Sequence, residues 1–233
     1  CAQNGLKSLP SEPKIVSIYL THLSTKDAKM STIKRRLVSI GVIHKLKGFY
    51  MDTKHPLIIE NMMGIKRRKG IIQKGKKPIL INNLKSLINV IDQENNDEMK
   101  KIRDRSIILI GFSGGFRRSE IVALNYDDLE FVQEGLKITL KKSKTDQFGE
   151  GSIKGLPYFD NSQYCPVISL EKWIKVSKID SGPLFRRFIK GSKLSEKRLT
   201  DQTIALIIKK YLKLTGIDSK NYSGHSLRSG FAT

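Results

Sequence analysis

The stretch Gly114-Gly115-Phe116-Arg117-Arg118-Ser119-Glu120 decides how this 233-residue chain is interpreted. A helix that begins near Asp97 precedes it, and from Ile107 onward that helix is almost entirely apolar, which predicts that it is buried. The two glycines are typical of a helix end. Two arginines beside glycines are most often surface charge, so this stretch gains meaning through the segments elsewhere that accompany it.

The chain carries a large excess of positive charge. Its formal net charge is +21 and its sequence pI is about 10.0. Residues 1–78 hold 17 Lys and Arg against 4 Asp and Glu, a surplus of 13, whereas the remainder holds 26 against 18, a surplus of 8. Such a field attracts polyanions and releases their counterions. High solubility or an AT-rich genome explains part of the lysine excess, but this distribution favours nucleic acid as the partner.

Membrane and secretory classes of protein fit the sequence poorly. Hydrophobic residues make up 39% of the chain, and the longest apolar stretch, Ile107–Phe112, is too short to span a bilayer. A binder of anionic membranes would concentrate its charge on one amphipathic helix. Two cysteines, Cys1 and Cys165, cannot form a disulfide framework or a zinc site. We expect a cytoplasmic protein without a membrane partner.

Residues 1–72 predict a helical domain. Ser11-Glu12-Pro13 is typical of a helix start, and Ile15, Ile18, Tyr19 and His22 follow at helical spacing. A second helix carries Ile33, Leu37, Ile40 and His44 on one face. A third begins at Pro56, with Ile59, Met62 and Met63 expected inward, and it ends on four cations, Lys66, Arg67, Arg68 and Lys69. Cations suit the end of a helix dipole, but four in a row favour contacts with phosphates.

Residues 73–80 predict a linker, because Gln73–Pro78 is polar and basic with Gly and Pro and no periodicity. Lys76 and Lys77 in this linker are further candidates for DNA contacts. Residues 81–233 predict a mixed α/β domain that is mainly helical. Helices are expected after Asn82 or Asn83, after Asp97, over Ser119–Leu129, from Pro166, and from Thr200 or Asp201 to Gly216, with a β-hairpin formed by Gly135–Lys141 and Ser152–Phe159.

Two other segments accompany the arginine stretch, Lys142-Ser143-Lys144-Thr145-Asp146-Gln147 and Gly224-His225-Ser226-Leu227-Arg228. Each is weak alone, since a hairpin lysine is usually solvated and His/Arg pairs are often structural. In this order, after a helical domain, the set resembles the tyrosine recombinase (phage integrase) family. The resemblance covers nearly the whole chain and includes Cys165-Pro166-Val167 and Gly182-Pro183-Leu184-Phe185, which are typical of the bacterial integrase branch.

The resemblance implies a fold and a set of roles. It implies an all-α, SAM-like core-binding domain followed by a catalytic domain with a small antiparallel sheet. It also implies that Arg117 and Arg228 clamp the scissile phosphate, because a guanidinium stays charged and matches phosphate oxygens. His225 would bind the same phosphate or transfer a proton, and Lys144 would protonate the leaving 5′ oxygen. Glu120 would orient an arginine, although a helix-capping role is equally open.

The resemblance further implies a site-specific recombinase that acts on duplex DNA, assembles as a tetramer on recombination sites, associates with the nucleoid and serves a mobile element. No metal, ATP or other cofactor is implied. The acids Asp127, Asp128 and Glu130 are interpreted as solvated or capping groups. Trp173 is expected in the core, and His44 is expected to be a packing residue.

The family's nucleophilic tyrosine does not match any tyrosine of this chain. Tyr222 precedes His225, and Tyr211 lies on an apolar helix stripe. We therefore expect the nucleophile, and a second His or Trp, to lie beyond Thr233, and the chain as given to be inactive. A type IB topoisomerase and a non-catalytic DNA-binding regulator remain as alternatives. The sequence does not give the target site.

Overall fold

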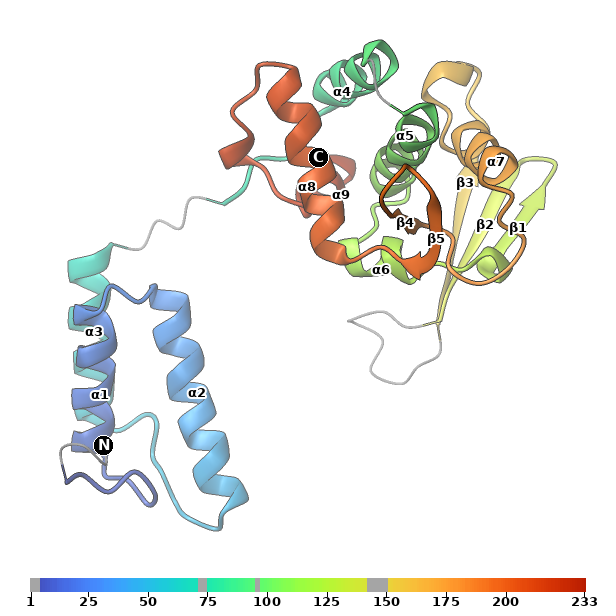
Figure 1. Ribbon diagram of the computed structural model, residues 1–233. Coiled ribbons are helices and arrows are strands. Elements are labelled where there is room, and N and C mark those ends of the chain that lie inside the picture. Colours follow the sequence, from blue (N-terminus) through green and yellow to red (C-terminus); the bar gives the residue numbers. More distant parts are fainter. Residues whose placement is uncertain (1–4, 71–74, 95–96, 142–150) are drawn as a thin grey trace. The chain divides into compact units, whose positions relative to one another are not determined.

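The computed structural model describes residues 5–70, 75–94, 97–141 and 151–233 (Figure 1). The chain divides into two compact units, Cys1–Lys74 and Gly75–Thr233, and each has its own hydrophobic core. Among the described residues, every helix is too short or too polar to cross a lipid bilayer.

The first unit consists of the three helices α1 (Pro13–Thr25), α2 (Met30–Leu46) and α3 (Pro56–Lys69). Pro13 and Pro56 each occupy the first turn of a helix, where the missing N–H group is not needed. The helices pack around a small core, Val16, Leu20, Ile33, Ile58 and Ile65. The sequence predicted these helix starts correctly.

The sequence did not predict which faces of α1 and α3 are buried. Ile18 of α1 is 51% exposed and Ile59 of α3 is 45% exposed, whereas Val16, Leu20 and Ile58 are buried. Both helices carry two overlapping apolar rows, and periodicity alone does not select one of them.

His44 is a packing residue, as the sequence suggested. Its side chain is 2% exposed, and Nε2 accepts a hydrogen bond from the backbone N–H of Ser11 at 2.9 Å. Nδ1 lies 2.8 Å from the carbonyl oxygen of Ile40. Both ring nitrogens are therefore satisfied within the unit, which is what burial of an imidazole requires.

The second unit is mostly helical with two small antiparallel sheets, as predicted for this part of the chain. Its elements in chain order are α4 (Ile81–Gln93), α5 (Glu98–Ser113), α6 (Arg118–Ala123), η2 (Tyr126–Asp128), β1 (Leu129–Val132), β2 (Gly135–Leu140), β3 (Ser152–Pro157), η3 (Ser162–Tyr164), α7 (Pro166–Ser177), β4 (Arg186–Phe188), β5 (Leu194–Arg198), α8 (Asp201–Leu214), η4 (Ser219–Asn221) and α9 (Ser226–Phe231).

Several helix boundaries follow from local chemistry. The Asp97 side chain accepts hydrogen bonds from the N–H groups of Met99 and Lys100 at the start of α5, and Gly114 ends that helix. Thr200 caps α8 in the same way. The helix expected over Ser119–Leu129 is present as α6, but its predicted end is wrong, because the chain leaves α6 after Ala123 and makes the short turn η2 before entering β1.

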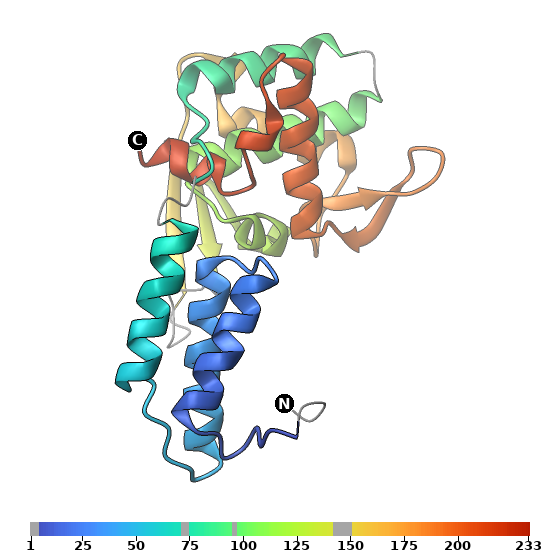
Figure 2. The same cartoon turned by 90° about the vertical axis from the view of Figure 1, so that its left-hand side faces the viewer.

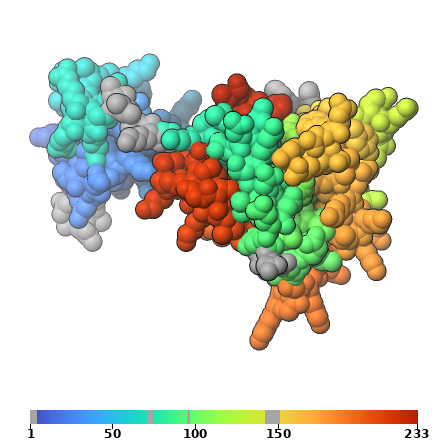
Figure 3. Space-filling model, turned by 90° about the horizontal axis from the view of Figure 1, so that it is seen from above, coloured from blue at the N-terminus to red at the C-terminus, as the bar shows by residue number. Residues whose placement is uncertain are grey.

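The three-stranded sheet has the order β1-β2-β3, and both pairings are antiparallel. The predicted hairpin is thus confirmed, with Ile138 opposite Lys154. The pair β4 and β5, which the sequence did not reveal, forms a separate two-stranded sheet. Figures 2 and 3 show this hairpin, in orange, projecting from the body of the second unit.

Helix α5 runs through the core of the second unit, where α7 and α9 pack against it. Trp173 of α7 is fully buried and its Nε1–H donates to the carbonyl of Leu184 at 2.9 Å, so the prediction that it is a core residue is confirmed. Near the start of α5, the buried carboxylate of Asp104 accepts hydrogen bonds from Arg103 and from the hydroxyl of Tyr211.

The segment before α4 belongs to the second unit. Ile79 is fully buried in its core, and the backbone N–H of Ile79 donates to the carbonyl of Ser226 at 2.9 Å. Lys77 makes a similar bond to Asn221. Residues 77–79, which the sequence placed in a linker, are therefore anchored beside the segment that leads into α9.

Candidate active site

Arg117 occupies the turn between α5 and α6. Gly115 has a φ of +55°, a left-handed conformation that glycine adopts without strain, and it reverses the chain after α5. Arg117 is then the N-cap of α6, with extended backbone, and its side chain is 19% exposed. The predicted combination of a buried helix, two glycines and an arginine thus forms a rigid turn that presents a guanidinium.

Glu120 holds Arg117 at two points. One carboxylate oxygen accepts the backbone N–H of Arg117 at 2.8 Å, and the other accepts Nη1 of its guanidinium at 2.6 Å. Glu120 is only 4% exposed. Burial acts to raise its pKa, but the backbone N–H and the guanidinium of Arg117 together hold the pKa below its usual value. The capping role and the arginine-orienting role, left as alternatives by the sequence, coexist in one side chain.

Arg228, which lies near the C-terminal end of the sequence, contacts the same turn. It lies on α9, and its Nη1 donates to the carbonyl of Gly115 at 2.9 Å. The same Nη1 lies 4.0 Å from Oε2 of Glu120, the oxygen that accepts the backbone N–H of Arg117. Its side chain is 43% exposed. Two arginines that are far apart in the sequence therefore converge on one buried acid.

The position of α9 depends on a close backbone approach. A Cβ added at Gly230 would lie 1.8 Å from the carbonyl oxygen of Ile79. This oxygen belongs to the backbone, which cannot move aside as easily as the end of a flexible side chain. The same helix packs on α5, where a Cβ on Gly111 would lie 3.0 Å from Leu227. Small residues at both contacts allow α9 to lie where Arg228 reaches the turn.

His225 is the N-cap residue of α9 and is exposed. Its backbone N–H donates to the hydroxyl of Ser223 at 3.3 Å, and its carbonyl accepts from Ser229. An exposed imidazole three residues before Arg228 is available to a ligand. The structure gives no contact between this imidazole and the two arginines.

Lys144 lies outside the described residues, so its position is not established here. The same hairpin contributes Lys154, which the sequence analysis did not single out. The ammonium group of Lys154 donates to the carbonyl of Gly114 and lies 4.5 Å from the centroid of the Phe116 ring. Strand alternation was the missed signal, since Lys154 shares the inward face of β3 with the buried Leu156.

Arg118, the rival of Arg117 in the sequence, has a different environment. Its Nη2 lies 3.8 Å from Asp201 of α8, and its aliphatic part packs on Gly224. A Cβ added to that glycine would lie 1.7 Å from Cδ of Arg118. Arg118 therefore packs between α6, α8 and the segment before His225, away from the pairing with Glu120.

The basic residues expected to meet DNA differ in their partners. In the first unit, Lys69 pairs with Asp27 at 2.9 Å and Arg68 donates to Ser24 at 2.9 Å, while Lys66 and Arg67 are exposed. In the second unit, the ammonium of Lys76 contacts the carbonyl of Lys220, and Lys77 is exposed.

The acidic residues after α6 have structural partners. Asp128 accepts the backbone N–H of Asn125 at 2.9 Å and pairs with Lys141 at 2.7 Å. Glu130 pairs across the sheet with Lys137 at 3.0 Å. These contacts are those of capping and solvated acids, as the sequence suggested for them.

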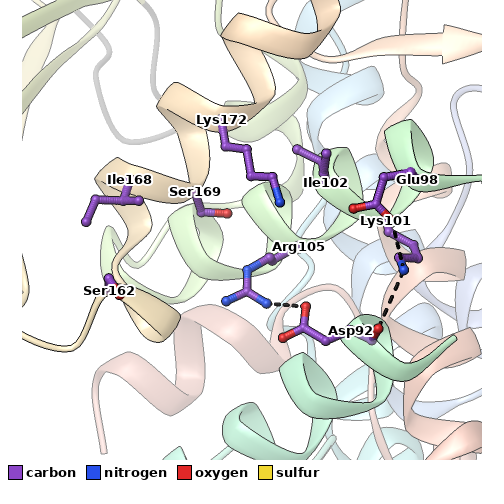
Figure 4. Close-up of a pocket in the computed structure, with 9 residues that line it drawn as sticks. All are labelled: Asp92, Glu98, Lys101, Ile102, Arg105, Ser162, Ile168, Ser169 and Lys172. Carbon is purple, nitrogen blue, oxygen red and sulfur yellow. Dashed lines mark hydrogen bonds and ion pairs between the residues drawn. The ribbon is translucent and has the colours of Figure 1, made fainter.

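A cleft between α4, α5 and α7 is chemically distinct from the arginine pair. It is lined by charged residues of both signs, and Figure 4 shows the Arg105 guanidinium against Asp92. Lys101 pairs with Glu98 at 2.9 Å. Arg105 and Lys101 each pair with an acid in this cleft, whereas Arg117 and Arg228 share the one carboxylate of Glu120 among the described residues, so the turn is the stronger candidate for binding an anion.

Comparison with known proteins identifies the family. The model of the phage integrase family matches residues 79–233, which include Arg117, Glu120, His225 and Arg228. The chain belongs to the phage integrase family. The family match covers the whole turn, the hairpin and α9, so the convergence of two arginines described above lies entirely within it.

Curated relatives of this phage integrase member are recombinases. The chain is 38% identical, over its whole length, to an integrase/recombinase xerD homolog of Selenomonas ruminantium, of which it covers 68%. It is 28% identical over 64% of its length to the tyrosine recombinase XerC of Caldanaerobacter subterraneus subsp. tengcongensis, of which it covers 36%. The chain thus spans between about a third and two thirds of these relatives.

Solved structures share the fold at low sequence identity. The post-cleavage complex of the XerH site-specific recombinase with a palindromic difH substrate matches 95% of this chain and 60% of its own, with a TM-score of 0.69 and 16% identity. The lambda integrase bound to DNA matches 97% of this chain and 70% of its own, with a TM-score of 0.61 and 12% identity.

Proposed function

We propose that this chain is the DNA-binding and phosphate-activating part of a site-specific recombinase, which cleaves and rejoins DNA strands through a 3′-phosphotyrosine link. The observation that carries the proposal is the convergence of Arg117 and Arg228 on Glu120, at 2.6 and 4.0 Å. Two arginines held at one buried acid provide fixed positive donors, which is what a phosphodiester under attack requires.

The two arginines act on the phosphate. Attack at phosphorus gives a five-coordinate species whose equatorial oxygens carry the developing charge. Arg117 and Arg228 neutralise this charge, and they do so without rearrangement because Glu120 and the carbonyl of Gly115 already hold them. His225 binds the same phosphate or moves a proton, and Lys144 delivers a proton to the departing 5′ oxygen. The reaction needs neither ATP nor a metal, because the phosphotyrosine link conserves the energy of the broken bond.

The first unit binds the duplex. The surplus of 13 positive charges over residues 1–78 and the exposed Lys66 and Arg67 support this role. Two of the structural neighbours are complexes with DNA, XerH with its difH substrate and lambda integrase. We propose the same partner for this chain and, in addition, its assembly as a tetramer on recombination sites. Such an enzyme of a mobile element would work in the cytoplasm on nucleoid DNA.

We place the nucleophile after Thr233. All seven tyrosines lie in the described part of the chain. Tyr158, Tyr164 and Tyr211 donate their hydroxyls to Glu171, Asn89 and Asp104. Tyr19 and Tyr50 belong to the first unit, and Tyr126 and Tyr222 pack on the second core. These surroundings suit packing and structural hydrogen bonds.

The test is a covalent trap. A duplex selected for binding from a random library, and then nicked close to the cleavage position, releases a short fragment on cleavage and so prevents rejoining. Residues 1–233 should bind this duplex without forming an adduct. The chain extended by the residues that its gene encodes after Thr233 should form an adduct that survives denaturation, and Tyr→Phe at the mapped position should abolish it.

Each other outcome contradicts a defined part of the proposal. Absence of any adduct from the extended chain, with duplex binding intact, supports a non-catalytic DNA-binding regulator. An adduct together with plasmid relaxation, but without strand exchange between two duplexes, supports a type IB topoisomerase. An adduct formed by residues 1–233 shows that the nucleophile has been misplaced, with Tyr222 the first residue to examine.

A further inference from the structure

Lys154 is an inward-facing cation on β3. Its neighbours on the strand, Ile153 and Gly155, are exposed, whereas Leu156 on the same face as Lys154 is buried. Across the sheet, Lys154 lies opposite the fully buried Ile138. Lysine is rarely placed toward a core unless its ammonium has a task there.

The ammonium of Lys154 and the guanidinium of Arg228 hold consecutive carbonyls of one turn. Lys154 donates to the carbonyl of Gly114, and Arg228 donates to the carbonyl of Gly115 at 2.9 Å. Lys154 also lies over the ring of Phe116, at 4.5 Å from its centroid. The turn that carries Arg117 is therefore fixed from β3 on one side and from α9 on the other.

Positively charged side chains gather at this turn. Among the described residues, the three cations Arg117, Lys154 and Arg228 all interact with the one buried carboxylate of Glu120. Burial lowers the pKa of Lys154, and the two arginines lower it further, although Glu120 acts to raise it. Without a bound anion, the ammonium is thus disfavoured, which is the property of a group that awaits negative charge.

We propose that Lys154 is a third cation of the phosphate site, which positions the Arg117 turn and adds positive charge where the transition state becomes more negative. This inference rests on the proposed function and assigns Lys154 a role separate from that of Lys144. In this inference Lys154 acts through its fixed charge, and protonation of the leaving 5′ oxygen stays with Lys144. Its contribution requires the positive charge itself.

The test compares Lys154→Met and Lys154→Arg with the matched control Lys137→Met. Lys137 is an exposed cation on the adjacent strand β2, paired with Glu130. The extended chain is assayed in single turnover at saturating DNA, with an ordinary duplex and with one whose leaving group is a 5′-bridging sulfur. A thiolate leaves without protonation, so this substrate removes the need for a general acid.

Lys154→Met should slow cleavage by about two to three powers of ten on both substrates, as is typical when one transition-state donor is lost. Lys154→Arg should recover most of the rate, and Lys137→Met should remain within about twofold of the wild type. At subsaturating DNA, where the rate reports groups of the free chain, the wild-type rate on the sulfur substrate should decrease as the pH rises through a value below the usual lysine pKa of about 10.4, and Lys154→Arg should move this decrease to higher pH.

Three results overturn the inference. One is a Lys154→Met rate equal to that of Lys137→Met. Another is rescue of Lys154→Met by the sulfur substrate, which makes Lys154 the proton donor instead. The third is Lys154→Arg as slow as Lys154→Met with the pH profile unchanged, which indicates a packing role. Thermal melting checks that each variant is folded. If Lys154→Met does not fold, the rate and pH profile of Lys154→Arg still test whether the charge of Lys154 contributes to cleavage.

A second measurement keeps the inference separate from the proposed function. If the extended chain forms no adduct, the recombinase proposal fails, but residues 1–233 can still be titrated with inorganic phosphate. Amide chemical shifts of Gly114 and Gly115 report binding at the turn. Lys154→Met should weaken this binding severalfold relative to Lys137→Met. Equal affinities in the two variants would show that Lys154 adds no charge to an anion site.

Discussion

Glu120→Ala should destabilise the second unit by about 3 kcal/mol. The mutation removes the acceptor of the Arg117 backbone N–H, 2.8 Å away, and the counter-ion of its guanidinium, 2.6 Å away. Breaking a buried ion pair costs about 3–5 kcal/mol because the remaining charge stays desolvated. The Arg117 side chain keeps 19% exposure, which favours the lower end. Glu120→Gln retains an acceptor for the N–H and should cost about 1–2 kcal/mol.

The dependence on pH separates charge from packing. The pKa of Glu120 is lower in the folded chain than its usual value of 4.5. A carboxyl with a depressed pKa stabilises the fold fully above its unfolded pKa, and this stability disappears as the pH falls through the folded pKa. The difference in unfolding free energy between wild type and Glu120→Gln should therefore be complete at pH 7 and shrink below about pH 4.5.

Urea unfolding at a series of pH values, followed by circular dichroism, measures this difference. Burial raises the pKa of Asp104, which acts in the opposite direction, but that carboxyl is common to both proteins and cancels in the comparison. Equal midpoints for wild type and Glu120→Gln at pH 7, or a difference that stays constant into acid, would refute the argument that Glu120 acts through its charge.

Three further predictions concern DNA binding and the placement of α9. The affinity of residues 1–233 for duplex DNA, measured by fluorescence anisotropy, should fall with salt at a log–log slope of about −0.9 per phosphate contacted, and a flat dependence contradicts binding through the basic surface. Removing residues 1–72 should weaken that affinity strongly while the melting transition of the second unit persists, because each unit has its own core; loss of the transition contradicts this independence. Gly230→Ala should lower the melting temperature and abolish adduct formation by the extended chain, since its Cβ would meet the backbone oxygen of Ile79 at 1.8 Å; an unchanged protein contradicts that packing constraint.

Local chemistry made much of the second unit predictable. Asp97 and Thr200 cap helices where the sequence placed them, and the hairpin joining β2 to β3 follows from alternation around a polar turn. These signals are contained within a few residues, so a single sequence is enough to recognise them. The pairing of Glu120 with Arg117 is a local signal of the same kind, because the two residues are three positions apart at the start of a helix and therefore lie close together.

Features that depend on tertiary contacts were not predictable in this way. The burial of Ile58 in place of Ile59 depends on which apolar row meets the other helices of the first unit. Ile79 lay in a segment with the composition of a linker, yet its backbone pairs beside α9. Lys154 was overlooked because its significance arises from Gly114, 40 residues earlier in the chain.

The rate of adduct formation by the extended chain tests the central claim most directly, namely that Arg117 and Arg228 form the phosphate site. Single-turnover cleavage of the nicked duplex should slow by about two to three powers of ten in Arg117→Ala and in Arg228→Ala, with DNA affinity largely retained. Arg118→Ala should have a mild effect, since its side chain packs toward Asp201 and Gly224. Arg117→Lys, which keeps a cation beside Glu120, separates loss of the fold from loss of the bidentate phosphate contact. A severe defect in Arg118→Ala, with near-normal cleavage by Arg117→Ala, would contradict this assignment of the site.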